Sequence, residues 1–130
     1  MSAAILLVDT DLGFLFWLGS ALDAAGYEAF PARSVPDAIA LLADLHLTVE
    51  LIIINFALAG AANFVRAMRQ ASRRLKIVSL SDPESSDLEF GPDAVFAKPA
   101  GVTQQATADL VQIVRTTLAS DASPLSRAVV

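Results

Sequence analysis

Short runs of apolar residues alternate along the chain with longer segments in which apolar residues recur at helical spacing. The runs are typical of strands buried on both faces, and they cover Ala4–Val8, Tyr27–Ala32, Glu50–Asn55, Leu75–Leu80 and Ala94–Ala97. The segments with helical spacing are Leu12–Ala25, Val35–Asp44, Ala62–Ser72 and Val102–Leu118. A further connection, Asp82–Pro92, is polar and contains two prolines, so it has room only for a shortened fourth helix.

Five strands that alternate with helices predict an α/β fold with a doubly wound parallel sheet and helices on both faces. The 130 residues are enough for one domain, and the 55% apolar content is enough for a sizeable core. We expect this domain to cover residues 1–119. Residues 120–130 lack periodicity, and we expect them to form a flexible tail.

Charge and cysteine content narrow the class of function. A net charge of −5 argues against nucleic acid or an anionic membrane surface as a partner. The absence of cysteine excludes disulfides and thiolate metal sites, and it fits a cytoplasmic protein. The first apolar run, Ala4–Val8, is too short for a signal peptide or a membrane span.

Polar residues stand where four of the predicted strands end. These residues are Asp9, Asn55, Ser81 and Lys98. In an open parallel sheet the carboxyl ends of the strands meet at one edge, where ligands bind. An acid, a hydroxyl and a lysine at this edge would suit a phosphate and a magnesium ion.

The order and spacing of these residues resemble the receiver domain of two-component response regulators over about residues 3–118. The resemblance rests on Ile5–Asp9, Leu51–Asn55 with Leu58 and Gly60, Val78–Ser81, and Asp93-Ala94 followed by Lys98-Pro99. It implies a flavodoxin-like (CheY-like) fold with the strand order 2-1-3-4-5. It also implies that the strand ends form the pocket that accepts a phosphoryl group.

Three positions depart from the receiver pattern. Receivers have an aspartate as phosphoacceptor where this chain has Asn55, a second acid where it has Thr10, and an aromatic residue where it has Val95. An amide is a very poor nucleophile, so we do not expect phosphorylation of Asn55 or enzymatic activity. Magnesium prefers carboxylate oxygens, so we expect weak binding or none, and no other cofactor.

The residues that remain at the strand ends, Asp9, Thr10, Asn55, Ser81 and Lys98, are called the strand-end pocket below. We predict an Asp9–Lys98 ion pair, with the other three residues completing the hydrogen bonds. Asn55 alone would be typical of a turn residue, but the other pocket positions favour a degenerate receiver site. Asp11 could replace a missing acid, but N-capping of the first helix is favoured.

Several other residues have both structural and functional interpretations. The basic residues Arg66, Arg69, Arg73, Arg74 and Lys76 are typical of a solvated face, with docking to an acidic partner as the alternative. Phe14, Phe16 and Trp17 cannot all face inward from one helix, so at least one should be exposed as a candidate interface. His46 stands alone and should lie at the surface.

The combined interpretation is a stand-alone pseudo-receiver in bacterial-type two-component signalling. We expect it to act by contact with a signalling protein, such as a histidine kinase or another regulator, or as a homodimer. Two alternatives stay open. The crevice beside Asp82–Pro92 could bind a small molecule, or phosphotransfer could use Asp11 or Ser81 as a non-standard acceptor.

Overall fold

The computed structural model describes residues 3–46, 48–80, 92–99 and 101–120. The elements in order are β1 (Ala4–Val8), α1 (Leu12–Ala24), β2 (Glu28–Ala32), α2 (Val35–Leu45), β3 (Leu51–Ile54), α3 (Ala61–Ala71), β4 (Lys76–Ser79), β5 (Ala94–Val95) and α4 (Gln104–Ala119). Each helix and strand predicted within these residues is therefore present, with its ends shifted by a residue or two. The shortened helix expected in Asp82–Pro92 falls almost entirely outside the described residues.

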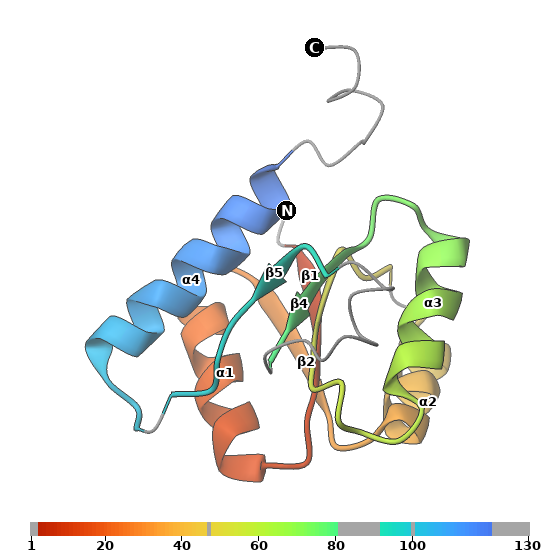
Figure 1. Ribbon diagram of the computed structural model, residues 1–130, viewed down its shortest axis with the longest axis horizontal. Helices are drawn as coiled ribbons and strands as arrows, with labels where there is room; N and C mark the ends of the chain where they lie inside the picture. The colour runs from red at the N-terminus through yellow and green to blue at the C-terminus, as the bar shows by residue number, and fades with distance from the viewer. Residues whose placement is uncertain (1–2, 47, 81–91, 100, 121–130) are drawn as a thin grey trace.

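The strands form one parallel sheet in the order β2-β1-β3-β4-β5. In the centre of the sheet, Ile5 pairs with Leu51 and Val8 pairs with Ile54, so β1 and β3 end side by side. The predicted doubly wound, flavodoxin-like fold is confirmed. Figure 1 shows α1 and α4 on one face of the sheet, and α2 and α3 on the other.

Each face of the sheet carries its own hydrophobic core, because successive strand residues point to opposite sides. Ile5 and Leu7 of β1 pack in the core beneath α1 and α4, whereas Leu6 and Val8 pack in the core beneath α2 and α3. All five residues of β1 and all four of β3 are buried. The central strands are therefore apolar throughout, and polar side chains appear only where those strands end.

Side-chain caps set where three of the helices begin. The side chain of Asp11 accepts a hydrogen bond from the Phe14 N–H, and Ser34 accepts one from Asp37. The favoured N-cap role of Asp11 is thus confirmed. Thr103 caps α4 by accepting from Ala106, so this helix begins later than predicted. Val102, the first residue of the predicted helical segment, accordingly lies outside the helix and is 66% exposed, so that predicted start was wrong.

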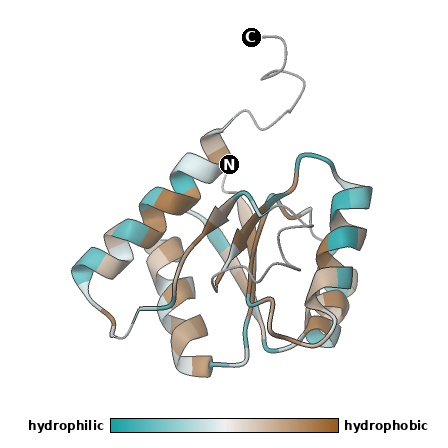
Figure 2. Ribbon diagram, viewed as in Figure 1, coloured by the Kyte–Doolittle hydropathy of each residue, from teal (hydrophilic) through white to brown (hydrophobic). Residues whose placement is uncertain are grey.

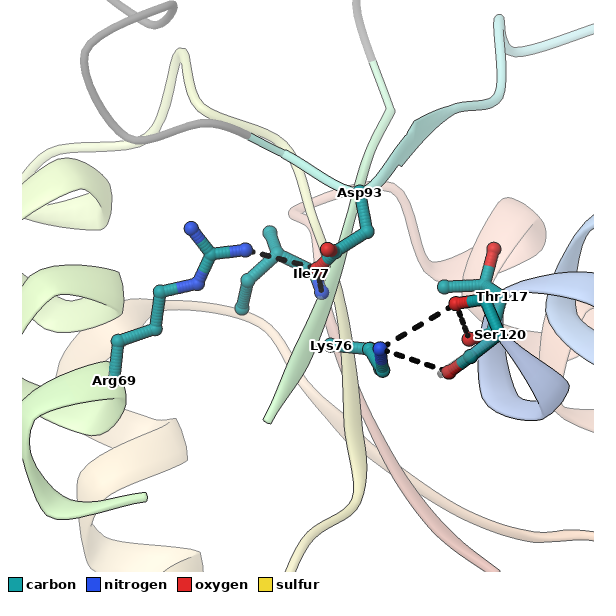
Figure 3. Close-up of polar contacts among 6 residues, drawn as sticks. All are labelled: Arg69, Lys76, Ile77, Asp93, Thr117 and Ser120. Atoms are coloured by element: carbon teal, nitrogen blue, oxygen red, sulfur yellow. Dashed lines mark hydrogen bonds and ion pairs between the residues drawn. The ribbon is translucent and has the colours of Figure 1, made fainter. Parts of the chain in front are cut away.

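Asp93 ties the start of β5 to two other elements. One carboxylate oxygen, Oδ2, accepts from the Ile77 N–H at 2.7 Å and from the Arg69 guanidinium at 2.8 Å (Figure 3). The interpretation of Arg69 as part of a solvated face was therefore wrong. Its side chain bridges α3 to the edge of the sheet.

Lys76 was also wrongly assigned to a solvated face. It is only 8% exposed, and its ammonium donates to the carbonyl and hydroxyl of Ser120 at 3.2 and 3.4 Å (Figure 3). The Ser120 hydroxyl in turn donates to the Thr117 carbonyl. A cation at the C-terminus of α4 also complements the helix dipole. Ser120 thus belongs to the folded domain, and residues 121–130 of the predicted tail lie outside the described residues.

We predict that Asp93→Ala lowers the free energy of unfolding by about 2 kcal/mol, because it leaves the Ile77 N–H without its carboxylate partner and removes the ion pair. Urea denaturation followed by circular dichroism measures the change. Asp109→Ala is a matched control, because Asp109 accepts one exposed hydrogen bond from Gln105 on the same helix and should cost about 0.5 kcal/mol or less. Equal losses in the two variants would show that Asp93 does not anchor β5.

Candidate functional site

The strand ends bring Asp9 and Lys98 together, although 89 positions separate them in the sequence. Asp9 follows β1, and its N–H donates to the Ala32 carbonyl, which extends the pairing of β1 with β2 by one residue. Lys98 lies three residues beyond the end of β5. Its Nζ is 2.8 Å from Asp9 Oδ2, so the predicted ion pair is present.

Asp9 is a buried charge, with only 1% of its surface exposed. Its Oδ1 accepts from the Thr10 N–H at 2.7 Å and from the Asp11 N–H at 3.5 Å. Its Oδ2 has no aligned hydrogen bond from any described residue, although the Lys98 ammonium is in ion-pair contact. Because an isolated buried carboxylate is very unfavourable, this contact with Lys98 is what makes the buried charge tolerable.

Lys98 has two further contacts on α1. Its ammonium lies 3.9 Å from Asp11 Oδ2 and 4.6 Å from the centroid of the Phe14 ring. The ring face attracts the cation, so Phe14 holds the ammonium beside the two carboxylates. The Lys98 side chain is one-third exposed, so water reaches one side of this arrangement.

Phe14 begins an aromatic series that continues away from the pocket. Its ring centroid is 5.7 Å from that of Trp17, and the Trp17 ring stacks on Phe96 at 6.2 Å. The Trp17 indole N–H donates to the Thr107 hydroxyl at 3.1 Å, which connects α1 to α4. This aromatic series was not predicted from the sequence. The only feature of the sequence that indicated it is the spacing of Phe14 and Trp17, which lie one turn apart on a helix.

Asn55 ends β3 and starts a turn. Its N–H donates to the Val8 carbonyl, and because Val8 pairs with Ile54, Asn55 lies beside Asp9 at the edge of the sheet. Its amide oxygen accepts from the Ala57 N–H at 2.9 Å. This bond is an Asx turn, the ordinary structural role of asparagine. The amide oxygen is therefore used within its own loop.

Thr10 and Ser81 are the remaining residues of the strand-end pocket. Thr10 is exposed at the end of β1. Ser81, the predicted switch hydroxyl, lies outside the described residues. Val95 is half-buried, and the neighbouring Phe96 is buried against the core beneath α1 and α4, as strand alternation predicted.

The donor set at this edge does not fit magnesium. The Asp9 carboxylate is neutralised by Lys98, position 55 supplies an amide, and position 10 supplies a hydroxyl. Magnesium binds through oxygen ligands and favours carboxylates with an unopposed charge. Within the described ranges, no three acidic or histidine side chains gather closely enough to hold a metal ion. The Lys98 ammonium supplies, beside Asp9, the positive charge that a bound metal ion would supply.

An apolar hollow of about 580 Å³ lies next to this edge, between the start of α1 and the end of β2. It is lined by Leu12, Gly13, Leu15, Phe16, Pro31 and Arg33. The hollow is beside β2 and is not the crevice beside Asp82–Pro92 where a small-molecule site was one alternative; that segment lies almost entirely outside the described residues. Phe16 is 77% exposed, so the expectation that one aromatic residue of the first helix faces water is confirmed.

His46 is exposed, as expected, and adopts a left-handed conformation with a φ of 49° at the end of α2. Over the residues that the structure describes, no helix combines the length and the apolar character needed to cross a bilayer.

No protein-family model matches the sequence, and a search of curated proteins finds no significant match. Solved structures do match. CheY4 of Vibrio cholerae, a chemotaxis protein, aligns with a TM-score of 0.74 and 20% identity over 90% of this chain and 99% of that one. A proposed response regulator of Chloroflexus aurantiacus aligns with a TM-score of 0.74 and 25% identity over 92% of this chain and 100% of the other.

An orphan response regulator of H. pylori also aligns, with a TM-score of 0.69 and 21% identity over 88% of this chain and 95% of that one. The chain therefore has the fold of a response-regulator receiver domain, and the predicted resemblance is confirmed at that level. Receiver domains are signalling domains that act with other signalling proteins. The fold alone does not determine the chemistry of the strand-end pocket in this chain.

We predict that Lys98→Met lowers the free energy of unfolding by about 2 kcal/mol, because it leaves Asp9 buried and unpaired. Asp9→Asn should cost less, because Lys98 is partly exposed and can be solvated. The double variant Asp9→Asn/Lys98→Met should recover most of the stability lost in Lys98→Met, since no buried charge remains. A double-mutant cycle measured by urea denaturation tests this, and additive losses would contradict the assigned pairing.

Proposed function

We propose that this protein is a pseudo-receiver, a receiver-like signalling domain that acts by protein–protein contact without phosphorylation of an aspartate. The observation that carries the proposal is the closed Asp9–Lys98 ion pair beside Asn55. The cation that would hold a phosphoryl group is already paired with a buried carboxylate. The residue that would accept that group is an amide.

Phosphoryl transfer to position 55 would require a nucleophilic oxygen. A carboxylate attacks through a full negative charge, whereas an amide oxygen is neutral and its nitrogen lone pair is delocalised. The Asn55 oxygen also accepts a backbone hydrogen bond from Ala57, which reduces its basicity further. We therefore propose that Asn55 has no acceptor activity and that the domain has no catalytic residue.

The same electrostatics argue against a magnesium cofactor. A divalent ion placed near Asp9 would have to compete with an ammonium 2.8 Å away, without help from a second carboxylate at position 10. We propose that magnesium binds weakly or not at all. The Asp9–Lys98 pair, and not a phosphate, would then hold the conformation of the domain.

The proposed partner is another signalling protein, such as a histidine kinase or another regulator, in the cytoplasm. The acidic composition makes nucleic acid an unfavourable partner, because the phosphate backbone would be repelled. Recognition would depend on the surface that the fixed conformation presents. A homodimer that forms through the surface of α1 is a further candidate.

Incubation with acetyl phosphate and magnesium, followed by intact-mass measurement, tests the absence of phosphorylation. We expect the wild-type chain to keep its mass. The variant Asn55→Asp/Thr10→Asp restores the two missing carboxylates and should gain one phosphoryl group, since the fold and Lys98 are retained. A receiver with the complete acidic set, treated in parallel, shows that the reagent is active.

A phosphoryl group on the wild-type chain would overturn the proposal. Asp11→Asn and Ser81→Ala would then identify the acceptor, because only loss of the true acceptor abolishes the mass increase. Asp11 is the less favourable of the two, since its carboxylate caps α1 and lies 3.9 Å from Lys98.

A further inference from the structure

The exposed side of α1 is unusually apolar for a helix that faces water. Asp23 is the only charged residue among the thirteen of this helix. Leu12 and Phe16, one turn apart, are 58% and 77% exposed. Figure 2 shows far less hydrophilic colour on α1 than on α3 or α4. A helix that is apolar nearly all round normally has partners on both sides, but the described residues of the sheet and of α4 leave Leu12 and Phe16 exposed on the other side of α1.

The same surface contains both a protrusion and a hollow. Phe16 projects into solvent and also forms one wall of the apolar hollow of about 580 Å³ between α1 and the end of β2. An exposed apolar ring beside an apolar recess is typical of an interaction surface, and a two-fold axis can bring this surface against the same surface of a second copy. An unrelated partner would need only the recess.

We propose that a second copy of this chain docks on this surface, with the two α1 helices antiparallel around a two-fold axis. Phe16 of each copy then lies opposite Gly19 of the other. Gly19 is half-buried and one turn from Phe16 on the helix, and a Cβ there would be in van der Waals contact with Leu7 of β1 at 3.9 Å. When Phe16 of one antiparallel helix lies opposite Gly19 of the other, Leu12 of one copy lies opposite Asp23 of the other.

Charges at the two ends of α1 select the antiparallel arrangement. Arg33 stands at the rim of the hollow near the start of the helix, and the exposed Asp23 stands near its end, close to the exposed Glu28. An antiparallel pair places each Arg33 beside Asp23 of the other copy, so two attractive pairs form. A parallel pair would place like charges together. The two helix dipoles are also opposed in the antiparallel arrangement, which is favourable.

The size of the surface predicts a weak dimer. One helix side and one strand end bury less than the roughly 1,200 Å² that marks the lower limit of standard interfaces. We therefore expect dissociation constants on the order of micromolar to tens of micromolar. The inference goes beyond the proposed function, because it does not depend on whether the strand-end pocket accepts a phosphate.

Sedimentation velocity of the full chain over a range of concentrations tests the proposal. The wild-type chain should shift from monomer to dimer as the concentration rises. Phe16→Glu should remain monomeric, and because Phe16 is exposed this variant should keep the wild-type circular dichroism spectrum. Ile39→Glu is a matched control, since Ile39 is 53% exposed on α2 outside the surface and should leave the dimer unchanged.

A charge exchange tests the orientation. Asp23→Arg and Arg33→Asp should each weaken the dimer by about tenfold or more, because each places like charges opposite one another. The combined variant should return to within about threefold of the wild-type dissociation constant. Additive weakening in the combined variant would overturn the antiparallel pairing.

Two other results would overturn the proposal as a whole. A wild-type chain that stays monomeric at every concentration would assign the hollow to a different protein or to an apolar small molecule. A dimer that survives Phe16→Glu would place the contact elsewhere on the chain. The phosphorylation test is unaffected by either result, so the dimer and the pseudo-receiver function can fail independently.

Discussion

The buried charge of Asp9 is the constraint on which the rest of this structure depends. The central strands are apolar along their whole length, and the first acid after β1 lies almost entirely out of water. A carboxylate in that position requires a cation, and Lys98, which follows the edge strand β5, supplies it. A receiver with a full acidic set can share its charges among a metal, a phosphate and a lysine. Here the ammonium of Lys98 is in contact with the buried Asp9 carboxylate, and the exposed Asp11 carboxylate lies 3.9 Å from the same ammonium.

The consequences of that pairing extend through the aromatic residues. Lys98 is held against Phe14, and the Phe14–Trp17–Phe96 series connects α1 with the end of β5 and, through Thr107, with α4. At other points of the sheet, Asp93 joins β5 to Arg69, and Lys76 joins β4 to the end of α4. A two-state switch needs an element with two arrangements of similar energy. The contacts of Lys98, Phe14, Trp17 and Phe96 connect α1, β5 and α4 to one another.

Much of this fold followed from sequence because its determinants are local or periodic. The buried strands, the Asp11 cap of the first helix and the meeting of Asp9 with Lys98 all derive from spacing and strand order. The roles of Lys76, Arg69 and Phe14 did not follow, because each depends on which side chain of a distant element lies opposite. Residue type alone made Lys76 and Arg69 resemble surface charges. The position of Lys76 in β4 buries its side chain beside Ser120, whereas Arg69 stays partly exposed on α3 and pairs with Asp93.

If, as proposed, the ion pair holds the domain in one conformation, phosphorylation cannot carry a signal by changing the shape of the domain. Under the proposed function, information would then lie in how much of the protein is present and in which partner occupies its surface. The exposed, apolar side of α1 suits that role, because a weak self-association responds to concentration over the range in which it forms. Under the two proposals, the amide at position 55 removes phosphoryl transfer at the strand ends, and the exposed Phe16 provides recognition through the surface of α1 in its place.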